Sequence, residues 1–224
     1  MFPAILLVPT DDGPRIASVS MANTEEIVKA SRWRLPRALA ELENPTPNHL
    51  DLLQKAKDGI ELAQLASKRW RHYRNSHTAA TSTDELRDLI KSDPTGEFCF
   101  FLTFSADWFP GRILGEVMLR RTWCHHLFMD FLYVHPSIAG QTSKVKKGIG
   151  YALLTSVAAS AKFFDVPLVW GEATETSSIW YSRQLCQHGD EAVKDHFFIR
   201  EDLISQFSSN FRKNHSIALA AKFS

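Results

Sequence analysis

This chain of 224 residues has little of several features that define specialised protein classes. It holds only three cysteines, Cys99, Cys124 and Cys186, widely spaced in apolar or helical contexts. Such a set argues against a disulfide framework and fits a reducing compartment. No apolar run is long enough to span a bilayer. The apolar stretch Met1–Val8 lacks the basic start and small-residue cleavage site of a signal peptide. We therefore expect a soluble, cytoplasmic protein that makes no membrane contact.

The sequence also lacks an excess of either charge, with 26 Lys and Arg against 25 Asp and Glu. No global field therefore draws the chain to nucleic acid. Acidic residues balance the basic ones locally too, which favours solvated helix faces over a nucleic-acid surface. We expect no nucleic-acid partner, and a homodimer remains open. The basic clusters in question are Arg32, Arg34 and Arg37, and Lys68, Arg69, Arg71 and Arg74.

The predicted secondary structure changes near residue 96, from mainly helical segments to dense apolar strands. The segment Phe2–Val8 predicts an opening strand, and a helical pattern from residue 23 is interrupted at Pro36. A long amphipathic helix is predicted over Asn48–Arg74 and a shorter one from Thr83. We expect residues 1–96 to form this strand and helices packed on the core, with a separately folding helical domain as the alternative.

Residues 97–224 carry the densest apolar runs. Phe98–Phe104 and Ile113–Leu119 flank a Pro-Gly turn and predict an antiparallel hairpin. The continuous apolar run Leu127–Val134 predicts a central strand buried on both faces. The fold class is therefore mixed α/β, a central sheet flanked by helices with an extended helical N-terminal part. Further helices are predicted over 149–164, 174–185 and 201–211, and further strands over 166–170 and 196–199.

The most informative motif follows the third strand of this core. Val134 leads through a polar loop to Gly148 and Gly150, where a helix begins. Glycines allow a ligand close to the backbone, and the first amides of a helix lack intrahelical partners and lie at the positive end of its dipole. This arrangement suits a phosphate or pyrophosphate, and a tight turn is the alternative. Lysines add positive charge there: Lys144, Lys146 and Lys147.

The order of strand, glycine loop, helix, strand and helix resembles the GNAT superfamily of acyl-CoA-dependent N-acyltransferases over roughly residues 97–186. The matching residues are Leu132-x-Val134-x-Pro136, Gly148-Ile149-Gly150-x-x-Leu153-Leu154, Pro167–Trp170 and Trp180-Tyr181. The resemblance implies acetyl-CoA or another acyl-CoA as co-substrate, with its pyrophosphate on the glycine loop and its pantetheine arm along the preceding strand. The cofactor-binding residues implied are Leu132, Tyr133, Val134, Lys146, Lys147, Gly148, Ile149, Gly150, Tyr151, Thr174 and Ser177.

The sequence departs from the family pattern at three places. Val145 stands where the family usually has Arg or Gln, the loop over 137–147 is long, and Thr174 stands where Asn is common. These departures support an alternative reading, a degenerate GNAT-fold protein that binds coenzyme A or a macromolecular partner without turnover. Ser177 has an alternative role as an ordinary helix-capping residue.

Acyl transfer to an amine benefits from an acid that protonates the leaving thiolate. A phenol suits this task because it is fully protonated at neutral pH and its pKa of about 10 is near that of the departing thiol. The resemblance assigns the role to Tyr181, on the last helix of the matched segment. Without the family, packing of an amphipathic tyrosine would explain this residue.

The candidate base is Asp130, the one acid in the apolar run Leu127–Val134. By strand alternation it is predicted to share a face with Leu132 and Val134, and burial would raise its pKa. Glu172, just past the next strand, is the second candidate, and Glu116 on the hairpin is the third. A structural acid bonded to the backbone or to an arginine is the alternative reading of Asp130.

Two further histidine-containing segments could in principle support metal binding or catalysis. Cys124-His125-His126 lacks a second ligand pair at a suitable spacing, so we expect no metal. His135 is interpreted as a surface residue. The sequence thus predicts an N-acyltransferase that moves an acetyl or other acyl group from acyl-CoA to an amine by direct attack. The acceptor cannot be read from the sequence, because fold alone does not fix it.

Overall fold

One mixed sheet runs through the molecule in the order β1-β2-β4-β5-β6-β7-β8, with β3 paired to β4. The computed structural model describes residues 2–42, 44–145, 147–185 and 193–223. Neighbouring strands are antiparallel except for the pairs β3–β4 and β6–β7. The strands are β1 (Ala4–Thr10), β2 (Gly13–Met21), β3 (Ala79–Ala80), β4 (Phe98–Ser105), β5 (Ile113–Arg121), β6 (Leu127–Val134), β7 (Val169–Glu172) and β8 (His196–Ile199).

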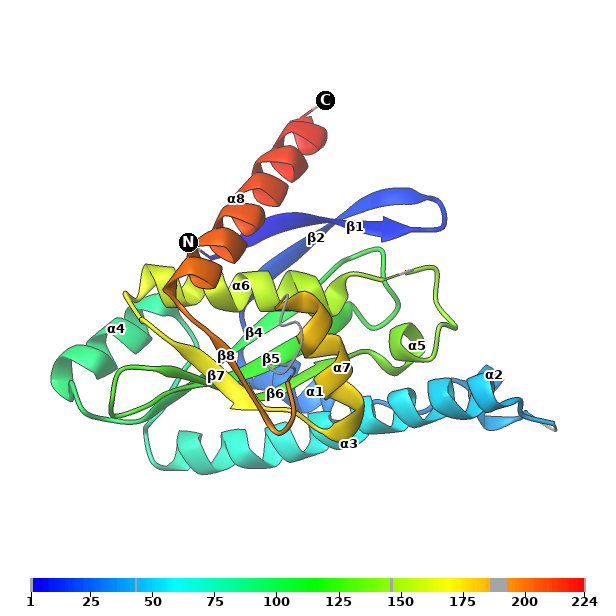
Figure 1. Ribbon diagram of the computed structural model, residues 1–224, viewed down its shortest axis with the longest axis horizontal. Coiled ribbons are helices and arrows are strands. Elements are labelled where there is room, and N and C mark those ends of the chain that lie inside the picture. Colours follow the sequence, from blue (N-terminus) through cyan, green and yellow to red (C-terminus); the bar gives the residue numbers. More distant parts are fainter. Residues whose placement is uncertain (1, 43, 146, 186–192, 224) are drawn as a thin grey trace.

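Helices cover both faces of this sheet (Figure 1). Those of the N-terminal half, α1 and α3, pack on the side that we call the α3 face, where Trp70 meets Phe101. The opposite side, the α6 face, is covered by α6, and α8 packs on α6 and β1. The helices are α1 (Thr24–Ala30), α2 (Arg37–Ala40), α3 (Pro47–Asn75), α4 (Thr83–Ser92), α5 (Pro136–Ala139), α6 (Ile149–Phe163), α7 (Glu175–Gln184) and α8 (Glu201–Phe223).

The predicted fold class is confirmed by this arrangement. The central strands β4, β5 and β6 are the three predicted from their continuous apolar runs, and most of their residues are buried because helices cover both faces. The long helix predicted over Asn48–Arg74 is α3. Within the described part of the chain, no helix has the length and apolarity needed to cross a membrane.

Strand β2 was not predicted, and α8 is longer than predicted. The opening strand was predicted over Phe2–Val8 alone, whereas the turn at Thr10–Gly13 connects β1 to β2 in a hairpin. In β2 only Ala17 and Val19 are fully buried, so its apolar signal is short. Because β2 pairs with β4, the sheet is continuous across residue 96. Helix α8 runs on to Phe223, well beyond the predicted end at Phe211.

Helix α8 also bonds to the outer edge of β1. The backbone N–H of Leu7 donates to Asn214 Oδ1 at 2.8 Å. The N–H of Ile5 donates to His215 Nδ1 at 3.2 Å. An edge strand otherwise presents unpaired backbone groups to other chains. Side chains of α8 therefore satisfy two of the donors on this edge.

Candidate functional site

β6 and β7 run side by side only briefly and then separate. The last pair of their parallel register is Met129 with Gly171. Beyond this pair, β6 is paired with β5 alone as far as Val134. Among the described strands, none pairs with residues 130–134 on the β7 side. This opening leaves strand backbone groups free of a ladder partner at the centre of the sheet.

A β-bulge lies where the opening begins. The register with β5 skips Asp130, which stands between the paired residues Met129 and Phe131. Leu132 and Val134 pack on the α6 face, whereas the Asp130 side chain meets an arginine of α3. The prediction that Asp130 shares a face with Leu132 and Val134 is therefore wrong, because a bulge inserts one residue and resets the alternation.

Asp130 is the centre of an ion network on the α3 face. Its side chain is 0% exposed and is paired with Arg69 of α3 and with Arg120 of β5, whose Nε lies 2.6 Å from Oδ2. Arg120 also contacts Glu97 at 3.0 Å, and Tyr73 donates its hydroxyl hydrogen to Glu97. Burial raises the pKa of Asp130, opposed by the two arginines. Both carboxylate oxygens are occupied, as the structural-acid alternative anticipates.

The N-terminus of α6 carries the glycine pair. Gly148 is the N-cap, with a φ of 101° in the left-handed region, and no side chain caps the helix. This backbone favours glycine and leaves the first-turn amides for another partner. Lys147 is exposed beside it. Lys146, one of the predicted cofactor-binding residues, lies outside the described residues, as does Cys186.

Other predicted cofactor residues of this segment have side chains committed elsewhere. Ile149 is 1% exposed and lies in the core. The Tyr151 hydroxyl accepts a hydrogen bond from Asn210 of α8 at 3.0 Å. Val145 is buried and bridges to Thr10 of β1. Ile149 can therefore serve a cofactor only through its backbone, whereas the exposed Tyr151 hydroxyl retains a hydrogen to donate. Val145 belongs to the core.

Helix α7 lies over the glycine pair. A Cβ added to Gly150 would lie 3.2 Å from Trp180, so the glycine permits this close packing. Thr174 and Ser177 form a capping box: the Ser177 N–H donates to Thr174 Oγ1 at 3.2 Å, and the Thr174 N–H donates to Ser177 Oγ at 2.8 Å. These hydroxyls thus cap α7, which was the alternative reading of Ser177.

Tyr181 and Glu172 have contrasting environments. The Tyr181 ring is 6% exposed and stacks on Phe197 of β8, with centroids 4.0 Å apart. Its hydroxyl makes no hydrogen bond to another described residue, and burial raises its pKa. Glu172 ends β7, is exposed, and makes no ion pair within the described ranges. It is the first residue of β7 beyond the last β6–β7 pair.

Glu116, the third base candidate, is enclosed within the α3 face. It is 0% exposed, and its carboxyl group accepts hydrogen bonds from Thr103 Oγ1 at 2.8 Å and from the Tyr133 hydroxyl at 2.7 Å. Burial raises the pKa of Glu116 to about 7. The Tyr133 side chain is thereby engaged within the protein, and Tyr133 pairs with Glu116 of β5 through its backbone.

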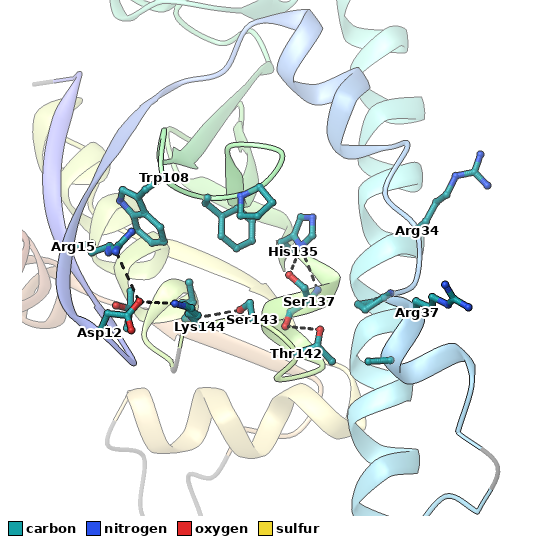
Figure 2. Close-up of a pocket in the computed structure, with 16 residues that line it drawn as sticks. Asp12, Arg15, Arg34, Arg37, Trp108, His135, Ser137, Thr142, Ser143 and Lys144 are labelled. Carbon is teal, nitrogen blue, oxygen red and sulfur yellow. Dashed lines mark hydrogen bonds and ion pairs between the residues drawn. The ribbon is translucent and has the colours of Figure 1, made fainter.

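A cavity of about 700 Å³ lies between the β1–β2 hairpin and the loop after β6. We call it the hairpin cavity. Figure 2 shows Asp12, Arg15 and Lys144 meeting at one side, whereas the guanidinium groups of Arg34 and Arg37 point away. Lys144 Nζ lies 2.9 Å from Asp12. The lining holds none of the predicted catalytic or cofactor-binding residues, although it includes Lys144 and other residues of the loop before Gly148: Thr10, Asp12, Arg15, Arg34, Pro36, Arg37, Ala38, Trp108, Phe109, Pro110, His135, Ser137, Thr142, Ser143, Lys144 and Val145.

His135 lines this cavity and is not the surface residue that was predicted. Its ring makes edge contacts with Trp33 at 4.9 Å and Phe109 at 5.0 Å. Its Nδ1 accepts the backbone N–H of Ser137 at 3.2 Å. Burial lowers the pKa of His135 to about 4, so the ring is neutral at physiological pH. This burial could not be predicted from the sequence, because Trp33 and Phe109, which cover the ring, come from distant segments.

A second cavity, of about 420 Å³, lies beside α3 at the bulge. We call it the α3 cavity. Five of its residues recur at helical spacing on α3, within the stretch interpreted from the sequence as a solvated basic face. Its lining residues are Leu65, Lys68, Arg69, His72, Tyr73, Arg120 and Phe131.

Comparison with known proteins gives structural neighbours only. No family model and no curated protein matches the sequence. PaiA N-acetyltransferase from Thermoplasma acidophilum, in complex with coenzyme A, is 13% identical over 82% of this chain and 98% of that one, with a TM-score of 0.43. A GNAT-family acetyltransferase from Staphylococcus aureus Mu50 is 11% identical over 81% and 97%, with a TM-score of 0.41.

Proposed function

We propose that this chain is an N-acyltransferase that moves an acetyl or other acyl group from acyl-CoA to an amine. The observation that carries the proposal is the opening of β6 from β7, beside the glycine N-terminus of α6. The free strand edge at residues 130–134 offers backbone donors and acceptors to an extended amide-bearing chain. The α6 amides at Gly148 offer an anion site.

The residues present fit such a co-substrate. A pyrophosphate would lie at Gly148, Ile149 and Gly150 with Lys147 beside it, and a pantetheine arm would follow the backbone of β6. When bound, acyl-CoA supplies an activated acyl thioester. Its thiolate leaving group needs a proton, for which we propose Tyr181, since a raised pKa keeps its hydroxyl protonated at neutral pH.

For the base we propose Glu172 ahead of Asp130. Each stands one residue beyond the last pair of β6 and β7, so the two acids flank the start of the opening. Asp130 is bonded to two arginines through both oxygens, which leaves it a poor proton acceptor. Glu172 has free carboxylate oxygens within the described structure. It would take the amine proton directly or through water.

One observation favours the alternative of a protein that binds coenzyme A without turnover. Trp180 lies against Gly150, and neither cavity is lined by Gly148 or Gly150. Trp180 therefore packs at one of the two glycines where the cofactor would bind. Binding without catalysis would follow if α7 does not move far enough for the thioester to reach Tyr181.

The test combines binding and turnover. Coenzyme A should raise the thermal unfolding midpoint by mass action. Lys147→Glu should weaken that shift, whereas Lys162→Glu, at the other end of α6, should preserve it. Tyr181→Phe should lower kcat for acetyl transfer about 100-fold with little change in coenzyme A affinity. No midpoint shift at millimolar coenzyme A would refute the proposal, and a shift without turnover on a broad amine panel would establish the binding-only alternative.

A further inference from the structure

We propose that the α3 cavity binds an acidic group of the acceptor, so that the amine substrate also carries a carboxylate or a phosphate. This inference rests on the proposed N-acyltransferase function and names the substrate class of the same site. Four observations carry it: the position of the cavity, the imbalance of its charges, the fixed orientation of one arginine and the location of Glu172.

The α3 cavity adjoins the start of the opening. Its wall includes Phe131, the residue that follows the bulge at Asp130. Arg120 of β5 and Arg69 of α3 complete the wall on either side. A molecule held there lies on the α3 face, whereas the glycine loop leads into α6 behind the sheet. Donor and acceptor would then approach the opening from opposite faces.

The charges that line the cavity are positive. Lys68, Arg69 and Arg120 contribute cations, and no acid belongs to the lining. Asp130, which pairs with both arginines, is fully buried behind them. Arg120 also pairs with Glu97, which is not part of the lining. Lys68 has no ion-pair partner within residues 2–42, 44–145, 147–185 and 193–223. Lys68 and the accessible N–H donors of Arg69 are therefore the groups that suit an anion.

Arg69 is held in an orientation that suits a planar anion. Its Nη1 is bonded to Asp130, and its guanidinium carbon lies 5.3 Å from the Phe131 ring centroid. The side chain is still 44% exposed, so its remaining N–H donors are accessible. A guanidinium fixed by a buried acid and a ring loses little further freedom on binding. Such a group recognises carboxylate or phosphate through paired hydrogen bonds.

Glu172 lies on the same face as this cavity. Val169 packs in the core of the α6 face, while Trp170 contacts Phe128, whose ring also lies 4.7 Å from the Arg120 guanidinium. Strand alternation then places Glu172 on the α3 face with Trp170. The cavity would hold the acidic group while the amine lies toward Glu172 and the opening.

The test compares matched amines and matched variants. Acetyl transfer is monitored through the release of the coenzyme A thiol. The rates for phosphoethanolamine are compared with those for ethanolamine, and the rates for β-alanine with those for its amide. We expect the anionic member of a pair to have a kcat/KM about tenfold higher or more. Lys68→Glu should abolish that preference. Lys57→Glu is the control, because it makes the same charge change on an exposed position of α3 that lies outside the cavity lining.

A second readout separates this inference from the enzymatic proposal. Inorganic phosphate and succinate are titrated into the protein saturated with coenzyme A, with chemical-shift changes followed on α3. Shifts in the wild type and in Lys57→Glu that vanish in Lys68→Glu support the anion site even if every amine is inert, an outcome in which only the enzymatic function fails. Equal shifts in both variants, no shifts at all, or a preference for the neutral amines would overturn the inference.

Discussion

The two faces of the sheet are built from different chemistry. On the α6 face, Leu153, Leu154 and Val157 are fully buried, and the hydroxyls of that helix bond to its own backbone. On the α3 face, two polar networks lie in the sheet, one around Glu116 and one around Asp130. The α6 face is therefore packed by apolar side chains, whereas the α3 face combines an apolar cluster with buried ionisable groups.

The largest expected effect comes from breaking the Asp130 network. Arg120→Met removes one of the two cations on a fully buried carboxylate, and the free energy of unfolding should fall by about 3–5 kcal/mol. The measurement is equilibrium unfolding in urea. Arg71→Met, on an exposed position of α3, should change it by less than about 0.5 kcal/mol. Equal effects of the two substitutions would mean that the charges of the α3 face are ordinary surface charges.

The second expected effect is a pH dependence that belongs to the α3 face alone. The pKa of Glu116 rises from its ordinary 4.5 to about 7, so between these values the folded state retains a proton that the unfolded state has released. The contribution of Glu116 to stability should therefore fall by about 3 kcal/mol as the pH rises through that window. The lowered pKa of His135 raises stability over a similar window, so the Glu116 contribution is measured as the difference between the wild type and Glu116→Gln. Glu116→Gln should remove this loss.

A substitution on the other face provides the contrast. Leu153→Ala should lower stability by about 2–5 kcal/mol at every pH, because a cavity in an apolar core does not titrate. Urea unfolding of Leu153→Ala and Glu116→Gln from pH 4 to 8 distinguishes the pH-independent loss from the pH-dependent one. Equal pH slopes in the wild type and in Glu116→Gln would assign the titration to another group.

The smallest expected effect lies on the edge of the sheet, which belongs to neither face. Asn214→Ala removes the acceptor of the Leu7 N–H and should cost about 1 kcal/mol. Lys213→Ala, an exposed neighbour on α8, should be neutral. The thermal unfolding midpoints of both variants are compared with that of the wild type. A neutral Asn214→Ala would mean that water replaces this acceptor at no cost.

The sequence predicted what depends on continuous local patterns. The apolar runs of β4, β5 and β6 and the stripe of α3 are long, so their elements were found with nearly correct bounds. Strand β2 was missed because its alternation is short, and its partner β4 lies some 80 positions along the chain.

The site was predicted less completely, because its geometry depends on register. One extra residue in β6 moved Asp130 to the other face, and no composition signal marks a bulge. The pairing of Arg69 and Arg120 with that acid joins α3, β5 and β6, so it appears only after the sheet has formed. The glycine pair, by contrast, was found because its position at the start of a helix depends only on neighbouring residues.

The bonds between α8 and β1 have a consequence for how the chain is made. The edge at Ile5 and Leu7 is synthesised first, while Asn214 and His215, which satisfy it, come some two hundred residues later. At translation rates of about 5–20 residues per second, that edge waits on the order of 10–40 seconds for its partners. During that interval the edge of β1 in a nascent chain is open to strand pairing with other chains translated from the same messenger RNA. Once α8 has been synthesised and folded, its side chains cover this edge.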